Sequence, residues 1–360
     1  MTVSAVNLDQ RRRQVLAAAV KHYVDTAEPV GSHAIAAALG FRISSATIRH
    51  DFTALEHAGY LHQPHTSAGR VPTDLGYRFY VNELMRPYPP GLKTQHLVVE
   101  LYREQTEFDP ALEATCRLLT SLTHYPALAA GPSWRNSLLR RIELTRINRT
   151  HVLAVIITQS GQIRHSLLAI TVVPSNDKLH QIADLLTHKF AGRRLGDLTR
   201  ESLLAALGIL PGGQKLREQA VELVIRSLGE REQSLAYVQG TALIFEQREF
   251  RHPERAQPLL QLLQDQAALI HLLQFEPASL KRSSPASAQT PSLVTVKIGK
   301  ENEREELQEC ALICASYQVA DRLAGSVAIL GPKRLPYERA VPTVHWVARR
   351  LGEALTRISQ

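Results

Sequence analysis

Apolar and polar positions follow two different periods within residues 44–80. In the first half of this stretch the apolar residues recur at i, i+4 and i+7, and they are Ile48, Phe52 and Leu55. This spacing predicts an amphipathic helix with one buried stripe. Ser44 or Ser45 stands just before the stripe and supplies a side-chain oxygen that can cap the first free N–H groups of the helix.

The polar positions of the same helix form an outward face, made up of Arg49, His50, Thr53 and His57. Gly59 ends the helix, and residues 60–63 predict a short strand. The turn formers that follow, Pro64, Ser67 and Gly69, hold a tip that carries His65 and Arg70. A helix with a polar outer face followed by a basic hairpin is the arrangement of a winged helix-turn-helix. In that motif the helix enters the DNA major groove and the wing touches the backbone.

Helical periodicity continues on both sides of this stretch. A first helix of about five turns is expected from the apolar residues between positions 15 and 24. Ser32 is expected to cap a short second helix that runs through Leu39, and Thr73 a later helix that runs through Leu84. Residues 87–91 are rich in proline and form a stiff linker, which predicts a domain boundary.

Beyond the linker the pattern predicts a mixture of helices and strands, which defines an α+β multidomain protein. Helices are expected at residues 112–122, 179–190, 198–207, 216–228, 259–273 and 337–358. Strands are expected at residues 142–144, 152–158, 163–170, 237–245, 293–298, 311–317 and 325–330. Residues 277–292 are rich in Ser, Pro and Ala, and we expect a mobile surface loop there.

Length and composition describe an ordinary soluble protein. The 360 residues suffice for two or three domains, and the chain is 44% hydrophobic and 21% charged. The first residues lack the apolar core of a signal peptide, and no purely apolar run is longer than that at 152–157, which is too short to cross a bilayer. We therefore expect a cytoplasmic, nucleoid-associated protein with no membrane partner.

The formal charge of +8 favours a nucleic-acid partner less than it first suggests. Through Met85 the chain has eight Lys and Arg residues against seven Asp and Glu residues, a net charge of only +1. The placement of basic side chains on the predicted helix and hairpin is the better argument for DNA binding.

Catalytic and metal-binding patterns are missing from the sequence. His57, His62 and His65 have suitable spacings for a metal, but no cysteine lies near to complete a zinc site. The Gly331-Pro332-Lys333 stretch fails the phosphate-loop pattern. The three cysteines, Cys116, Cys310 and Cys314, are too sparse for a disulfide framework and are expected to be buried and reduced. We expect no enzymatic activity, no cofactor and no metal.

A family resemblance rests on two blocks of residues. The N-terminal block comprises residues 28–32 (EPVGS), 45–49 (SATIR), 64–70 (PHTSAGR), Pro72-Thr73 and 76–81 (GYRFYV). The C-terminal block comprises residues 298–302 (IGKEN), 331–334 (GPKR) and Tyr337. Together they resemble the bacterial heat-inducible transcription repressor family, HrcA. The likeness covers both ends of the chain strongly and the middle loosely.

The resemblance implies a domain order and partners. It implies a winged-helix DNA-binding domain over residues 1–88, a GAF-like domain over 92–173 and 251–360, and an inserted, mainly helical dimerisation domain over 174–250. It also implies a homodimer that binds a double-stranded inverted-repeat operator (CIRCE) upstream of chaperone operons. Modulation by the GroEL chaperonin is likewise implied by the resemblance alone.

The DNA-contacting residues are expected on the third helix, the wing and the helix after it: Arg42, Ser44, Ser45, Thr47, Arg49, His50, Thr53, His65, Ser67, Arg70 and Arg78. Arg49 has a competing role as a solvated partner of Asp51 or Glu56. Arg70 has one as a partner of Asp74 at the start of the next helix. The family usually has Asn at the position of His50, and His cannot copy the bidentate contact of Asn to adenine.

A second interpretation stays open at this point. GAF-like domains often bind small molecules, so a metabolite-responsive winged-helix repressor is the alternative function. No cluster of polar residues in an apolar setting stands out in the sequence as its pocket.

Overall fold

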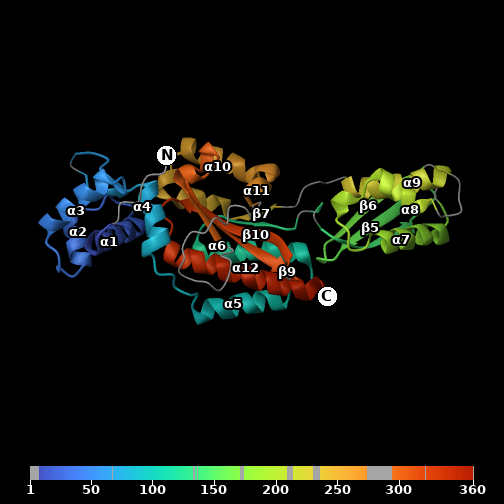
Figure 1. Cartoon of the computed structure of the whole chain (residues 1–360), viewed down its shortest axis with the longest axis horizontal. Helices are drawn as coiled ribbons and strands as arrows, with labels where there is room; N and C mark the ends of the chain where they lie inside the picture. The colour runs from blue at the N-terminus through green and yellow to red at the C-terminus, as the bar shows by residue number, and fades with distance from the viewer. Residues whose placement is uncertain are drawn as a thin grey trace.

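The computed structural model describes residues 8–66, 68–132, 134–135, 137–170, 174–208, 214–229, 236–273, 294–320 and 322–359. Three bodies follow one another along the long axis of the molecule (Figure 1). An N-terminal body (residues 8–84) lies at one end, a central body built on a five-stranded sheet lies in the middle, and a third body lies at the other end. The chain mixes helices and sheets, so the α+β class is confirmed.

The N-terminal body combines helices with a two-stranded hairpin. Its elements are α1 (Gln10–Thr26), α2 (Ser32–Ala38), α3 (Ser45–His57), β1 (Leu61–His62), β2 (Val71–Pro72), α4 (Asp74–Phe79) and a wider helical turn over Tyr80–Leu84. The Ser44 side chain caps α3 by accepting a hydrogen bond from the Thr47 N–H, and Thr73 caps α4 in the same way. The prediction that Ser32 caps α2 is wrong, because Ser32 is the first residue of that helix.

The central body is an antiparallel sheet in the order β7-β3-β10-β9-β8, with helices on both faces. The strands are β3 (Ala127–Ala130), β7 (Ala236–Gln239), β8 (Val294–Ile298), β9 (Cys310–Val319) and β10 (Arg322–Pro332). The helices are α5 (Leu92–Arg103), α6 (Phe108–Thr123), α10 (Pro253–Gln264), α11 (Gln266–Leu273) and α12 (Tyr337–Ser359). Helices α6 and α12 cover one face, and α10 and α11 cover the other (Figure 1). Nearly every residue of β9 is buried, because both of its faces are covered.

The third body has a core of its own. Strands β4 (Leu139–Arg146), β5 (His151–Thr158) and β6 (Ile163–Ala169) form an antiparallel sheet in chain order. Helices α7 (Asn176–Phe190) and α9 (Gln214–Gly229) pack on this sheet, and α8 (Arg200–Leu207) packs on them. Along β5, Val152, Ala154 and Ile156 are buried toward the helices, whereas the alternate residues are only half-buried. One sheet face is therefore covered, and the opposite face is open.

Several sequence-based expectations need correction. The pattern gave no sign of α5 or β3, and the strand expected at 237–245 ends at Gln239 and continues as a helical turn. The helix expected at 259–273 is two helices, which break at Asp265, where the carboxylate caps the second by accepting from the Ala267 and Ala268 N–H groups. The loop expected at 277–292 lies outside the described residues. No described helix combines the length and apolar content needed to span a membrane.

Candidate nucleic-acid interface

The polar face of α3 points away from the rest of the N-terminal body. Ile48, Phe52 and Leu55 are buried, as the spacing predicted. The residues expected to contact DNA in and before α3 are exposed or half-buried: Arg42, Ser44, Ser45, Thr47, Arg49, His50 and Thr53. They come from the turn before α3 and from its first two and a half turns.

Arg49 has no carboxylate partner among the described residues. Its Nε donates to the Ser32 hydroxyl at 3.3 Å, and the Thr53 hydroxyl donates to the Arg49 carbonyl oxygen at 3.1 Å. The competing pairings with Asp51 or Glu56 do not form, because each of those carboxylates pairs with another arginine. The Arg49 guanidinium is thus exposed and carries an unneutralised charge.

Asp51 has a structural role that the sequence reading missed. Its side chain is fully buried, and both carboxylate oxygens accept from Arg11 of α1, at 2.9 and 3.0 Å. Arg12 lies 3.6 Å from the same group. A signal was present in the sequence, because Asp51 falls at i+3 from Ile48 and so lies within the apolar stripe. The pair fixes α1 against α3 and sets the direction in which the α3 face points.

The hairpin after α3 is held by its own polar contacts. The Gln63 side chain donates to the carbonyls of Thr66 and Ala68, both at 2.9 Å, and so closes the tip. His65 is exposed on the tip, and Ser67 lies outside the described residues. At Gly69 a Cβ atom would lie 2.5 Å from the Val30 carbonyl, so only glycine permits this close approach.

Arg70 points toward α3 rather than outward. Its side chain is only 16% exposed, and its Nη2 lies 2.9 Å from the Glu56 carboxylate. Its backbone N–H and carbonyl both bond to Val30. The pairing with Asp74 that was weighed as an alternative is wrong, because Asp74 pairs with Lys333 instead.

Arg78 lies on a different surface from the α3 face. It forms an ion pair with Glu301 and donates to the Val296 carbonyl oxygen, both in the central body. A position near phosphate was expected for this residue; the structure instead engages it with the central body.

No three His, Cys, Asp or Glu side chains within the described parts of the chain lie close enough together to hold a metal ion. All three cysteines are buried and free, as expected. Burial raises the pKa of Cys310 to about 12 and that of Cys314 to about 11, which keeps both thiols protonated at neutral pH.

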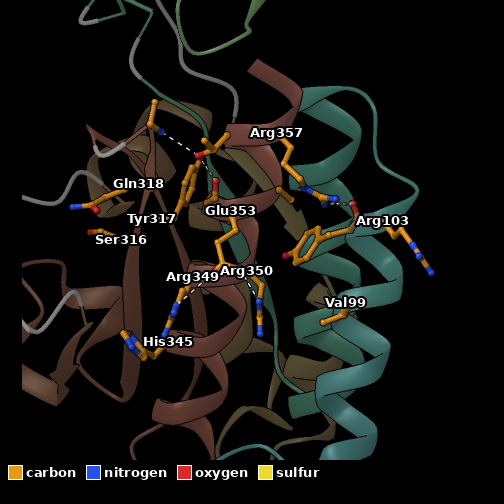
Figure 2. Close-up of a pocket in the computed structure, with 15 residues that line it drawn as sticks. Val99, Arg103, Ser316, Tyr317, Gln318, His345, Arg349, Arg350, Glu353 and Arg357 are labelled. Carbon is orange, nitrogen blue, oxygen red and sulfur yellow. Dashed lines mark hydrogen bonds and ion pairs between the residues drawn. The ribbon is translucent and has the colours of Figure 1, made fainter. Parts of the chain in front are cut away.

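A cleft of about 1020 Å³ lies between α5, α12 and the end of β9, and it is where a small ligand would be sought. Four arginines line it: Arg103, Arg349, Arg350 and Arg357. Figure 2 shows Arg349 and Arg350 close to Glu353, which pairs with both of them. Arg357 donates to the Tyr102 carbonyl at 3.0 Å. Contacts within the cleft thus account for the placement of three of the four arginines without a ligand.

Comparisons with known proteins agree over almost the whole chain. The family description "HrcA protein C terminal domain" matches residues 109–341. The "Heat-inducible transcription repressor HrcA" of Desulforamulus reducens is 32% identical over 354 residues, covering 98% of this chain and 99% of the relative. The protein of the same name from Symbiobacterium thermophilum is 33% identical over 347 residues, covering 96% and 98%. A crystal structure described as "a hypothetical protein at 2.2 A resolution" matches with a TM-score of 0.58 at 25% identity, covering 98% of both chains.

These relatives define the class as regulators of transcription, and their names indicate a regulator rather than an enzyme. The chain belongs to the HrcA family of heat-inducible transcription repressors. The resemblance inferred from the two blocks of motif residues is therefore confirmed.

Proposed function

We propose that the protein is a dimeric repressor that binds an inverted-repeat operator of the CIRCE type upstream of chaperone operons. In this proposal the N-terminal body is a winged helix, α3 enters the major groove, and the β1–β2 hairpin is the wing. The observation that carries the proposal is the exposed α3 face, on which the Arg49 guanidinium has no carboxylate partner among the described residues. An exposed guanidinium that donates to one neutral hydroxyl is available to a base edge or a phosphate.

The domain division of the proposal follows the separate cores. We keep the winged helix at residues 1–88 and place the inserted domain at about 133–235 instead of 174–250. Strands β4 to β6 and helices α7 to α9 share one apolar cluster that excludes the central sheet, which supports the earlier boundary. The GAF-like domain then comprises 92–132 and 236–360. Strands β3 and β7, which flank the insertion, pair with each other.

The open face of the third body's sheet is our candidate for the dimer contact. Ile163 and Leu167 on β6 are 64% and 58% exposed. Beside them on β5, Leu153, Val155 and Ile157 are half-buried on the same face. An exposed apolar patch of this kind, interrupted on β6 by His165, is typical of an interaction surface, and a two-fold dimer uses the same patch on both subunits.

Footprinting on an inverted repeat tests the proposal. Wild-type protein should protect both half-sites, with two chains per duplex measured by light scattering of the complex. Leu167→Glu should yield monomers, because it places a charge in the apolar contact, and should lose protection of the repeat. The matched control is Leu92→Glu, a change at a leucine of α5 that is 74% exposed outside this sheet, and it should behave as wild type. Protection of a single half-site by one wild-type chain would contradict the proposal.

We propose regulation by GroEL and association with the nucleoid because the chain belongs to the HrcA family. The relatives are named for heat induction, and this supports a chaperone-linked repressor over the metabolite-responsive alternative. If the proposal holds, adding GroEL and ATP during refolding should raise the fraction of chains that bind the operator. An unchanged fraction would contradict regulation by GroEL and would not affect the proposal of operator binding.

A further inference from the structure

Two C-terminal motifs remain without a role in DNA contact, namely residues 298–302 and 331–334. Both lie against the start of α4, in the seam between the N-terminal and central bodies. The residues concerned are Gly299, Lys300, Glu301 and Lys333, and we call them the seat.

The first contact of the seat holds Asp74, the first residue of α4. Its Oδ2 accepts from the Lys300 backbone N–H at 3.0 Å, and its Oδ1 lies 3.1 Å from the Lys333 Nζ. Lys333 also pairs with Glu309 at 3.2 Å. Burial opposes the charge of Lys333, but the two carboxylates outweigh it and raise the pKa of the lysine, so the lysine is charged at neutral pH.

The glycine of the seat permits a close approach between the two bodies. Gly299 has a φ of +55°, and a Cβ atom there would lie 2.1 Å from the Asp74 Oδ2. Any other residue would both strain the backbone and displace the carboxylate. The Asp74 side chain therefore lies directly on the backbone of the 298–302 turn.

A second contact lies one turn further along α4. The Arg78 guanidinium pairs with the Glu301 carboxylate and donates to the Val296 carbonyl oxygen. Glu301 is itself fixed, because its Oε2 accepts from the Ile298 backbone N–H at 2.9 Å. Asp74 and Arg78 are four residues apart, so they lie on one side of α4 and both face the central body.

A third contact lies at the start of α12. The Tyr80 hydroxyl donates to Glu338 at 2.8 Å, and the Tyr88 N–H donates to the Glu338 carbonyl oxygen at 2.9 Å. Further contacts join the two bodies: the ion pairs Lys21–Glu338 and Glu28–Arg248, and the rings of Tyr77 and Tyr337.

We infer that the seat fixes the orientation of the N-terminal body on the central body, and thereby sets the half-site spacing that the dimer accepts. Polar seams between domains ordinarily permit relative motion. Here the backbone contact at Gly299 and the charge-assisted hydrogen bonds select one arrangement. The spacing part of this inference rests on the proposed function; the orientation part does not.

Orientation is measured without DNA in the full chain. Spin labels at Ala37→Cys on α2 and Gln257→Cys on α10, both exposed positions, report the distance between the two bodies. The native cysteines are buried, and dilution with unlabelled chain suppresses distances between subunits. The seat variant is Lys333→Met with Glu301→Gln. The control variant, Arg226→Met with Glu222→Gln, removes an exposed ion pair of α9 and the pairing of Glu222 with Arg200 of α8.

Wild type and control should each give one narrow distance distribution, whereas the seat variant should give a broad one. A broad distribution at unchanged melting temperature also excludes general unfolding as its cause. Gly299→Ala provides a second route to the same result. A narrow distribution of unchanged mean distance in both seat variants would overturn the inference.

Spacing is measured on inverted repeats whose spacer grows stepwise over half a helical turn. The affinity of the wild type should fall about 10²–10⁴-fold, because the N-terminal body of the second subunit no longer reaches its half-site. The seat variant should bind the best repeat less tightly. Its affinity should fall at most about tenfold across the series, because its N-terminal bodies reorient at a lower free-energy cost. Identical profiles for variant and wild type would contradict the spacing role. Failure of wild type to bind any repeat would refute the proposed function and leave the distance measurement standing.

Discussion

At the residue scale, two arginines of the N-terminal body have opposite surroundings. Arg49 is exposed and has no carboxylate partner among the described residues, whereas Arg70 is 16% exposed and paired with Glu56. Both were expected on the DNA-contacting surface. The pairing shows that Arg70 links the hairpin to α3. Spacing along the sequence cannot distinguish this structural role from a phosphate contact.

We predict that Arg70→Ala lowers stability and leaves the salt dependence of DNA binding nearly unchanged. Loss of this partly screened pair should cost about 1 kcal/mol of unfolding free energy. A phosphate contact would instead flatten the slope of log K against log salt by roughly one unit. Urea unfolding and a salt titration on one purified variant decide between the two. A flattened slope at unchanged stability would show instead that Arg70 contacts DNA.

Residue-level features were predictable where they depend on neighbours in sequence. Ser44 and Thr73 cap their helices as expected, because capping is a contact over three residues. The pairing of Asp51 with Arg11 was not predicted, because the two residues lie on different helices. The pairings of Arg70 and Arg78 were likewise hidden, because each depends on a carboxylate that only the fold brings near.

At the element scale, the position of α3 depends on its attachment to α1. The buried Asp51 carboxylate joins the two helices by two hydrogen bonds to Arg11, with Arg12 nearby. The apolar stripe of α3 would tolerate some rotation, whereas a bidentate pair has one geometry. The direction of the outward face therefore follows from one charged contact as well as from the core.

We predict that Asp51→Asn destabilises the protein by about 1.5–3 kcal/mol, the usual range for hydrogen bonds to charged groups. Arg11 is 46% exposed and can be solvated once its partner is lost, which favours the lower part of that range. Urea unfolding measures the loss. Glu113→Gln, which removes an exposed pair within α6, is the control and should change stability by less than about 0.5 kcal/mol. Equal small effects of both variants would mean that the apolar stripe alone positions α3.

Element types followed from periodicity, but their partners did not. The long amphipathic helices and the alternating strands β5 and β6 were expected close to their observed bounds. Strand β3 was missed, because its four residues, three alanines and Leu128, are apolar and buried without alternation. It pairs with strands β7 and β10, which lie far away in the sequence, and helices cover both of its faces.

At the scale of the whole molecule, the order of bodies depends on such distant pairings. Strands β4 to β6 have the composition of central-sheet strands, and the sequence grouped them with that sheet; their own sheet and helices separate them from it. The C-terminal motifs were visible in the sequence as a family signature. Their contact with α4 became apparent only when the chain was folded, because it joins residues more than two hundred positions apart.

The central claim is that α3 reads the operator, and the ratio of operator to random-DNA affinity for Arg49→Ala tests it most directly. Arg49 lies off the buried stripe, so its truncation leaves no core cavity. We predict an operator affinity lower by about 1–3 kcal/mol, the worth of a bidentate base contact, with the random-DNA affinity changed much less. Arg226→Ala, at an exposed arginine of α9, should leave both affinities unchanged. An unchanged ratio for Arg49→Ala, or an equal fall on both DNAs, would contradict the account.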